Sequence, residues 1–137
     1  GSYFNSYNET GSMVVSAGVD PTQTEPAIKA IVGELHQLCE APVPVEELDR
    51  IKAYVRGGIL LGLEGTQQVA AWLGGQESLR NRVMDVDEMT AQIDAVTPEK
   101  IQHVAQACFA PEWRRLAIIG PDDSHRSAYF STLLKGE

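Results

Sequence analysis

The 137-residue sequence has only two cysteines, Cys39 and Cys108, too few for the disulfide framework that holds many small secreted domains together. Both cysteines fall on the apolar faces of predicted helices. We expect both to be buried free thiols, because free cysteine packs as a small hydrophobic residue. A redox or metal-ligand role is the alternative. This use of cysteine favours a reducing compartment.

Basic residues are also scarce, since 11 lysines and arginines face 19 acidic residues, which gives a net charge of -8. Nucleic acids and anionic membranes bind cationic surfaces, so this balance predicts neither as a partner. No apolar run approaches the roughly 20 residues of a membrane-spanning helix. The first residues, Gly1–Asn5, have neither the basic end nor the apolar stretch of a signal peptide. We therefore expect a soluble protein.

Hydrophobic residues make up 43% of the chain and charged residues 22%, which is typical of one compact domain over residues 1–137. The chain begins with a predicted hairpin, whose strands are Tyr3–Tyr7 and Ser12–Ala17. The turn between them ends at Gly11, which we expect to adopt a positive φ. Both faces of the second strand are mostly apolar, which favours an internal position in a sheet.

Helices are predicted through the middle of the chain. The first begins near Thr24, whose hydroxyl is expected to cap it, and ends near Cys39. Its apolar stripe is Ala27, Ile28, Ile31, Val32, Leu35, Leu38 and Cys39. The second carries one apolar stripe together with three glycines that each cost about 0.5–1 kcal/mol relative to alanine, so we expect close packing against them. A third helical pattern is interrupted at Gly74–Gly75. The stripe of the second helix is Leu48, Ile51, Val55, Ile59 and Leu63, and its glycines are Gly57, Gly58 and Gly62.

Further elements follow towards the end of the chain. Asp85 with Glu88 resembles a capping box, and Thr97-Pro98-Glu99 opens another helix. Residues Trp113–Ile119 are predicted to form a strand, and Asp122, Asp123 or Ser124 to cap a terminal helix that runs through Leu134. The fold class is therefore α+β, a partial antiparallel sheet of about three strands packed by five or six helices.

Three strands are few for so many amphipathic helices, so we expect an incomplete domain whose other strands lie upstream in a longer parent protein. Unpaired strand edges would then favour homo-oligomers.

Residues that could support catalysis are few. The histidines are His36, His103 and His125, and no two have the spacing of a helical zinc motif such as H-x-x-E-H. His36 and Cys39 could share a helix face, but a metal site needs three or four ligands. We therefore interpret all three histidines as structural or solvent-facing.

Paired acidic residues stand where helices begin, at Glu46-Glu47, Asp85-Asp87-Glu88 and Asp122-Asp123, where the helix dipole favours them. A general acid/base pair is the less favoured interpretation. Arg114-Arg115 is the only basic doublet and is interpreted as a strand edge. The glycine pairs form no phosphate-binding loop. We assign no catalytic, substrate-binding or metal-binding residue, and the residues indicate a scaffold or partner surface.

One series of segments, in this order, resembles a known family. It is the turn Asn8–Gly11, then Val45–Lys52, Leu60–Thr66, Asp94–Ile101 and Leu116–Pro121. The series is similar to the C-terminal domain of the insulinase/pitrilysin family of zinc metallopeptidases, which includes the mitochondrial processing peptidase. The resemblance covers essentially the whole chain.

The resemblance implies homologous α+β domains that enclose a chamber and cleave peptides there. In such enzymes zinc is held by two histidines and a glutamate of the N-terminal domain, and none of these ligands falls on this chain. The family's C-terminal domain is inactive and contributes an arginine and a tyrosine to substrate binding. That pair precedes the segment that matches Tyr3–Tyr7, so neither Tyr3 nor Tyr7 corresponds to the family tyrosine.

The expected function is thus the non-catalytic C-terminal portion of a zinc metalloendopeptidase, inactive alone, which forms chamber wall and domain interface. Its expected partners are the homologous N-terminal domain, or a subunit that carries the zinc motif, and peptide substrates. A catalytically inactive homologue that acts as an assembly subunit is the alternative. The expected compartment is the bacterial cytoplasm.

Overall fold

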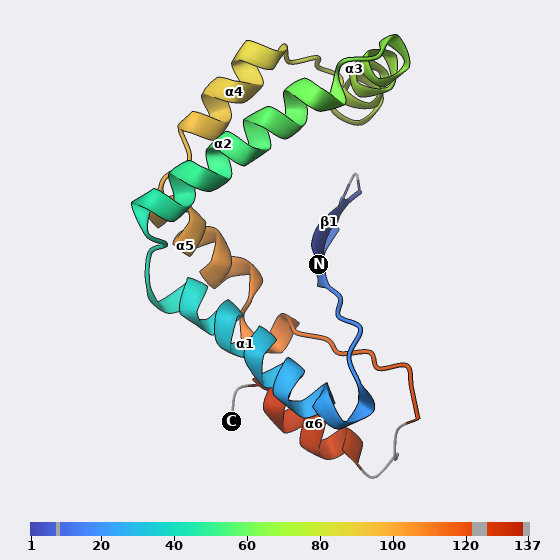
Figure 1. The fold of residues 1–137 in the computed structure, drawn as a ribbon, viewed down its shortest axis with the longest axis vertical. Coiled ribbons are helices and arrows are strands. Elements are labelled where there is room, and N and C mark those ends of the chain that lie inside the picture. The colour runs from blue at the N-terminus through green and yellow to red at the C-terminus, as the bar shows by residue number, and fades with distance from the viewer. Residues whose placement is uncertain (8, 122–125, 136–137) are drawn as a thin grey trace. The chain divides into compact units, whose positions relative to one another are not determined.

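The structure is a computed structural model that describes residues 1–7, 9–121 and 126–135. It contains a two-stranded sheet and helices that follow it along the chain (Figure 1). The elements are β1 (Ser2–Ser6), β2 (Gly11–Val15), the 3₁₀ turn η1 (Pro21–Gln23), α1 (Thr24–Glu40), α2 (Val45–Gly62), α3 (Thr66–Arg80), α4 (Val86–Asp94), α5 (Pro98–Cys108), the 3₁₀ turn η2 (Pro111–Trp113) and α6 (Ser127–Lys135).

The predicted hairpin is confirmed as the antiparallel pair β1 and β2, with Ser2 opposite Val15 and Ser6 opposite Gly11. Gly11 is required for a different reason from the one expected. Its φ is not positive, but an added Cβ would lie 2.9 Å from the main-chain oxygen of Asn5. Glycine therefore permits the close approach of the two strands beside the turn.

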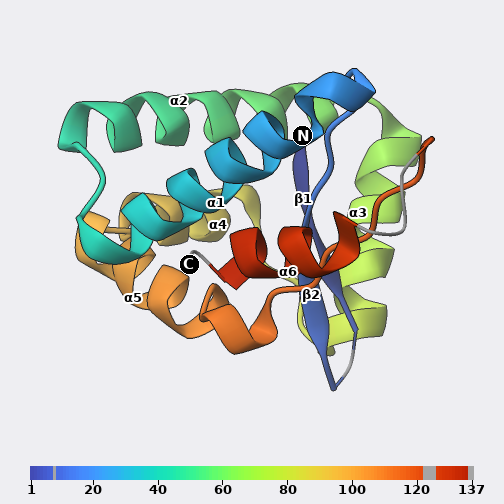
Figure 2. The same ribbon diagram turned by 90° about the horizontal axis from the view of Figure 1, so that it is seen from below.

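The chain divides into two compact units, Gly1–Pro42 with Gln102–Glu137, and Val43–Ile101. In the first unit α1 and α6 lie side by side (Figures 1 and 2). Ile28 and Val32, one turn apart on α1, pack with Phe130 of α6, and Leu133 and Leu134 cover this cluster. The helical spacing of the predicted α1 stripe thus identified the face that forms this core.

In the second unit α2 lies beside α4. The Lys52 ammonium donates to the main-chain oxygen of Asp94 at 2.9 Å, and the Arg56 guanidinium donates to the Asp94 carboxylate at 2.7 Å. Both contacts lie at the carboxyl end of α4, where the helix dipole favours cations. Leu48 is buried on the same side of α2.

The predicted third strand is not present among the described residues. Residues Pro111–Trp113 form η2, and the residues after Trp113 are extended without a ladder partner. A strand exists only where a neighbouring chain segment pairs with its main chain, and the described sheet contains only β1 and β2. The expectation of about three strands is therefore wrong for this structure, and β2 is not internal to a sheet.

Two expectations about helix ends and continuity also need correction. Thr24 does not cap α1, because it is already the first residue of the helix. The Asp20 carboxylate instead caps η1, just before α1, by accepting from the main-chain nitrogen of Thr22. Helix α3 runs without interruption through Gly74 and Gly75. It ends at Asn81, which has the left-handed φ of 51° often found just after a helix.

The glycines of α2 are not closely packed by any described residue. The helix continues through Gly57, Gly58 and Gly62, and an added Cβ at each would meet nothing within 4 Å. The expected close packing is therefore absent here. The conformational cost of these glycines is not offset by contacts within the described part of the chain.

Replacing Phe130 by alanine should lower the free energy of unfolding by about 3–5 kcal/mol, because its ring is 3% exposed at the centre of the α1–α6 core. Phe4→Ala is the matched control, since that ring is 71% exposed. Urea unfolding followed by circular dichroism measures both variants. An equal effect of the two substitutions would contradict this core.

Replacing Gly58 by alanine should raise the free energy of unfolding of the isolated chain by about 0.5–1 kcal/mol, because the site is helical and open. Gly11→Ala is the contrasting control and should destabilise the hairpin, since its Cβ would meet the Asn5 oxygen. Thermal unfolding gives both values. A loss of stability in Gly58→Ala would show that this face is already packed.

Candidate functional site

A groove of about 540 Å³ lies between the extended segment after η2 and helix α6. The groove has mixed walls, with apolar side chains from both elements and charged side chains among them. It is lined by Pro111, Glu112, Arg114, Arg115, Leu116, Ile118, Phe130, Ser131, Leu134 and Lys135.

Arg114 fixes the start of the extended segment. Its Nε donates to the main-chain oxygen of Phe109 at 2.9 Å, and its Nη1 donates to that of Leu134 at 3.0 Å. The second contact places a cation on a carbonyl of the last turn of α6, where the helix dipole is negative. Arg114 thus joins the end of α5, the extended segment and α6. From the sequence alone, Arg114 is interpreted only as part of a strand edge.

The groove is cationic although the chain is acidic. Arg114, Arg115 and Lys135 line it, and Glu112 is the one acidic residue among its described lining residues. Arg115 donates from Nη1 to the main-chain oxygens of Glu112 and Arg114, both at 2.7 Å, so its guanidinium lies along η2. Against the net charge of -8 for the whole chain, this is a local excess of positive charge.

A second polar cluster joins α1 to α6 around the carboxylate of Glu25. Tyr129 donates to this carboxylate at 2.5 Å, Lys29 contacts it at 2.8 Å and Arg126 at 3.5 Å. The Arg126 guanidinium also lies 4.8 Å from the centre of the Phe130 ring, a cation–π contact. The cluster therefore links α1 to α6, the two helices that the apolar core also holds together.

These contacts shift three pKa values. Hydrogen bonds from Lys29 and then from Tyr129 lower the pKa of Glu25. The hydrogen bond to Glu25 raises the pKa of Lys29 and also that of Tyr129. The three groups therefore favour an ionised carboxylate, a charged lysine and a neutral phenol, which is the arrangement of a structural clamp.

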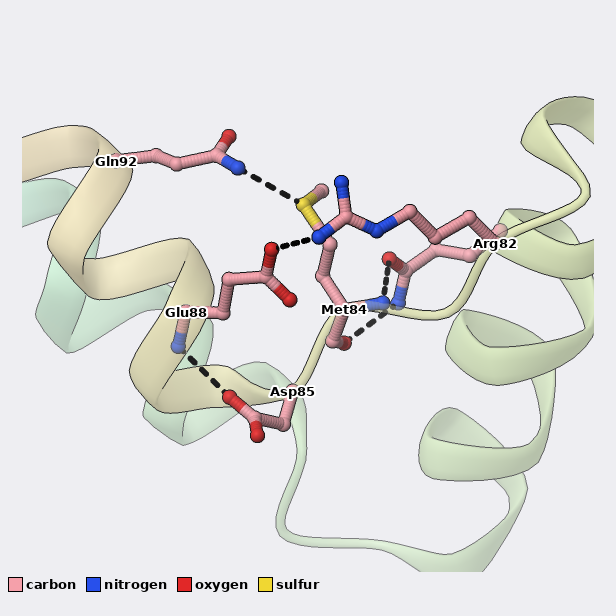
Figure 3. A network of polar contacts seen from close by, with 6 residues as sticks. Arg82, Met84, Asp85, Glu88 and Gln92 are labelled. Atoms are coloured by element: carbon pink, nitrogen blue, oxygen red, sulfur yellow. Dashed lines mark hydrogen bonds and ion pairs between the residues drawn. The ribbon is translucent and has the colours of Figure 1, made fainter.

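The second unit contains a polar network where α3 passes to α4 (Figure 3). The buried Gln76 side chain accepts from the main-chain nitrogen of Met84 at 3.1 Å and donates to its oxygen at 3.4 Å. Asp85 accepts from the main-chain nitrogen of Glu88 at 2.7 Å, which confirms it as the cap of α4. The Glu88 carboxylate binds Arg82 and does not complete a capping box. These contacts fix a helix connection.

The histidines and cysteines singled out in the sequence do not come together. His36 faces Glu40 at 3.3 Å on the exposed surface of α1, and His103 is exposed on α5. Cys39 is half-buried, whereas Cys108 is exposed, so the expectation that both thiols are buried is wrong for Cys108. His125 lies outside the described residues.

The acidic pairs have the capping and first-turn positions expected of them. Glu46 and Glu47 lie in the first turn of α2, and Asp87 and Glu88 in that of α4. Asp122 and Asp123 are outside the described residues, as is Ser124. Within residues 1–7, 9–121 and 126–135, no three His, Cys, Asp or Glu side chains are grouped to hold a metal ion. The described donor set does not fit a zinc centre.

The chain matches the sequence model of the peptidase M16 inactive domain over residues 1–55. This class of domain is the one that the sequence resemblance implied. Together with the relatives described next, the match supports a fragment of the C-terminal domain of an insulinase-family (M16) peptidase.

Three relatives illustrate the similarity. The chain is 32% identical over 88% of its length to an uncharacterised zinc protease of Streptomyces coelicolor, and 27% identical over 88% to one of Bacillus subtilis. It is 28% identical over 88% to the bovine mitochondrial-processing peptidase subunit beta. The aligned part spans 26%, 29% and 24% of these relatives, so the chain corresponds to about a quarter of their length.

No helix that the structure describes is both long and apolar enough to cross a bilayer.

Replacing Glu25 by glutamine should lower the thermal unfolding temperature at pH 7, and the difference from the parent chain should shrink as the pH falls towards 3. The folded pKa of Glu25 is lowered, so its contribution is present above the unfolded pKa, about 4.3, and is lost as the pH falls through the folded value.

Glu34→Gln is the control, because Glu34 lies exposed on α1 and forms no contact that could produce this dependence. Circular dichroism at several pH values measures both variants. A difference for Glu25→Gln that stays constant from pH 7 to pH 3 would contradict the clamp.

Proposed function

We propose that this chain is the non-catalytic C-terminal portion of a zinc metalloendopeptidase, and that it forms a wall and domain interface for peptide hydrolysis carried out elsewhere in the protein. The observation that carries the proposal is the match to an inactive peptidase domain, together with relatives of which the aligned part is about a quarter. A part of this kind contributes surface and leaves the bond-breaking chemistry to its partner.

The exposed face of α2 supports a packing role. Ile51, Tyr54 and Leu61 recur at helical spacing and are 48%, 79% and 69% exposed. Gly58, between Tyr54 and Leu61, and Gly62, just after Leu61, lie on the same face, and an added Cβ at either would meet nothing within 4 Å. Exposed apolar residues that recur along one helix face are typical of a surface that another polypeptide covers.

The zinc chemistry belongs to the partner in this proposal. Zinc would supply the Lewis-acid chemistry of peptide hydrolysis. The family resemblance implies that two histidines and a glutamate of the homologous N-terminal domain would hold it, and the described donors of this chain do not form such a site. The role of this chain is to exclude bulk water and to bound the space in which peptides lie.

The partner is either an N-terminal domain of the same polypeptide or a separate subunit. The alternative function is an inactive homologue that acts as an assembly subunit. The chain is also 28% identical over 74% of its length to the Neurospora crassa mitochondrial-processing peptidase subunit alpha, and a relative named as a subunit supports pairing with another polypeptide. The bacterial cytoplasm remains our proposed compartment, since zinc proteases of bacteria are among the relatives.

Purified chain supplied with zinc should not hydrolyse a fluorogenic peptide, and zinc titration should show no stoichiometric site. The gene segment upstream should encode H-x-x-E-H in the same or an adjacent reading frame. This motif separates the two functions, because only the peptidase requires it.

Turnover that a chelator abolishes in the isolated chain would overturn the proposal. A parent gene without the motif would replace it with the assembly function. A preparation of the chain with His36 and His103 both changed to alanine is the control for adventitious metal binding.

A further inference from the structure

We infer that the exposed face of α2 binds the same face of a second copy of this chain, with the two helices antiparallel. The inference rests on the proposed function only in that another polypeptide covers this face, and it identifies that polypeptide. The residues of the face recur alternately four and three positions apart, which is the spacing of a coiled-coil seam. The seam consists of Glu47, Ile51, Tyr54, Gly58 and Leu61.

The seam lies on the side of α2 that its own unit leaves open. The opposite side packs within the unit, since Leu48 is buried there and Lys52 and Arg56 bind the end of α4. The Tyr54 side chain is 79% exposed, and an added Cβ at Gly58 would meet nothing within 4 Å. A second helix can therefore approach the seam without displacing any contact between α2 and α4.

The side chains of the seam complement one another when the second helix is antiparallel. Tyr54 then lies opposite Gly58 of the second copy, where the ring has the space of an absent side chain. In the same register Ile51 lies opposite Leu61, and the two-fold axis repeats both contacts. A parallel pair would instead place Tyr54 against Tyr54 and Gly58 against Gly58. One layer would then be overfilled and another empty, and both faults are destabilising.

The charges beside the seam fit the same register. Arg50 and Glu64 are exposed, and their side chains form no hydrogen bond or ion pair with any described residue. Glu64 continues the course of α2, because its main-chain nitrogen donates to the oxygen of Leu61 at 3.5 Å. Antiparallel pairing places Arg50 opposite Glu64 of the second copy, twice by symmetry. A parallel pair would place Arg50 beside Val55 instead.

The helix ends are complementary as well. Helix α3 begins after Gly65 with no side-chain cap and no acidic residue in its first turn, and α2 has no basic residue in its last turn. In the antiparallel register Glu47 of the second copy lies beside the start of α3, and Arg50 of the second copy lies beside the last turn of α2. Each helix end thus gains the charge that its dipole favours.

The contact is small, which sets the strength of the dimer. Helix α2 has 18 residues and is therefore about 27 Å long. A standard interface buries about 1,200–2,000 Å², and one pair of helices of this length covers less. The net charge of -8 also repels two copies at low ionic strength, a repulsion that salt screens. We therefore expect a weak dimer, formed at high protein concentration in physiological salt.

Sedimentation equilibrium of the purified chain from about 10 μM to 1 mM, in about 0.15 M salt, should show a monomer–dimer equilibrium. Tyr54→Gly and Gly58→Tyr should each raise the dimer Kd about tenfold. The double variant Tyr54→Gly with Gly58→Tyr should return to within about threefold of the parent, because every layer again pairs a large side chain with glycine. Circular dichroism checks that each variant keeps its helix content.

A charge exchange tests the second contact. Arg50→Glu and Glu64→Arg should each weaken the dimer about fivefold, because each places like charges opposite one another. The two substitutions together should restore the parent Kd. Arg80→Glu, in the last turn of α3 and outside the seam, is the matched control and should leave the Kd unchanged.

Spin labels determine the direction of the two helices. They are attached at Val55→Cys or at Asp49→Cys in a chain whose Cys39 and Cys108 are changed to serine. Val55 lies beside the two-fold axis of the antiparallel pair, so its two labels should be close together. The two labels at position 49 should be more than about 20 Å apart. A parallel pair would give similar short distances for both.

A chain that stays monomeric at 1 mM would overturn the inference, and the face would then belong to a different polypeptide. A double variant Tyr54→Gly with Gly58→Tyr that dimerises no better than the single variants would also overturn it, as would similar label distances at positions 55 and 49. None of these measurements involves zinc, hydrolysis or the upstream gene. Self-association can therefore fail while the peptidase proposal stands, and the reverse also holds.

Discussion

The polar groups of an extended main chain must form hydrogen bonds, either with another segment or with water. Residues 115–119 are extended and have no main-chain partner among the described residues, although their side chains are those of a covered strand. Water satisfies these groups in the isolated chain, but Ile119 and the face of α2 leave apolar surface exposed at a cost of about 25 cal/mol per Å². Both features support the proposal that another polypeptide covers these surfaces.

Contacts among the described residues hold helices together in two places, one in each unit. A small apolar core of Ile28, Val32 and Phe130, together with the polar clamp around Glu25, holds α1 against α6. In the other unit, Lys52 and Arg56 bind the end of α4. The α1–α6 contacts hold α6, which forms one wall of the groove, and Arg114 fixes the start of the extended segment that forms the other wall.

Local sequence signals predicted what depends on neighbours in sequence. The hairpin, the helical stripe of α1 and the capping role of Asp85 follow from alternation, helical spacing and side-chain reach, and the structure confirms them. The strand predicted at Trp113–Ile119 is not formed among the described residues, because a strand also needs a neighbouring segment to pair with, which local side-chain alternation cannot reveal, and the described sheet contains only β1 and β2. Cys108 has the spacing of a buried residue, yet it is exposed because no described element covers that face. The groove had one visible signal, the Arg114-Arg115 doublet in an acidic chain, but the contact of Arg114 with Leu134 spans 20 residues and required the fold.

The most direct measurement is hydroxyl-radical labelling of Tyr54 and Leu61 on α2, compared between the isolated chain and the same residues within an assembled M16-type peptidase. The account predicts ready labelling in the isolated chain, where these side chains are 79% and 69% exposed, and protection in the assembly. Equal labelling in both would contradict the proposal that another polypeptide covers this face.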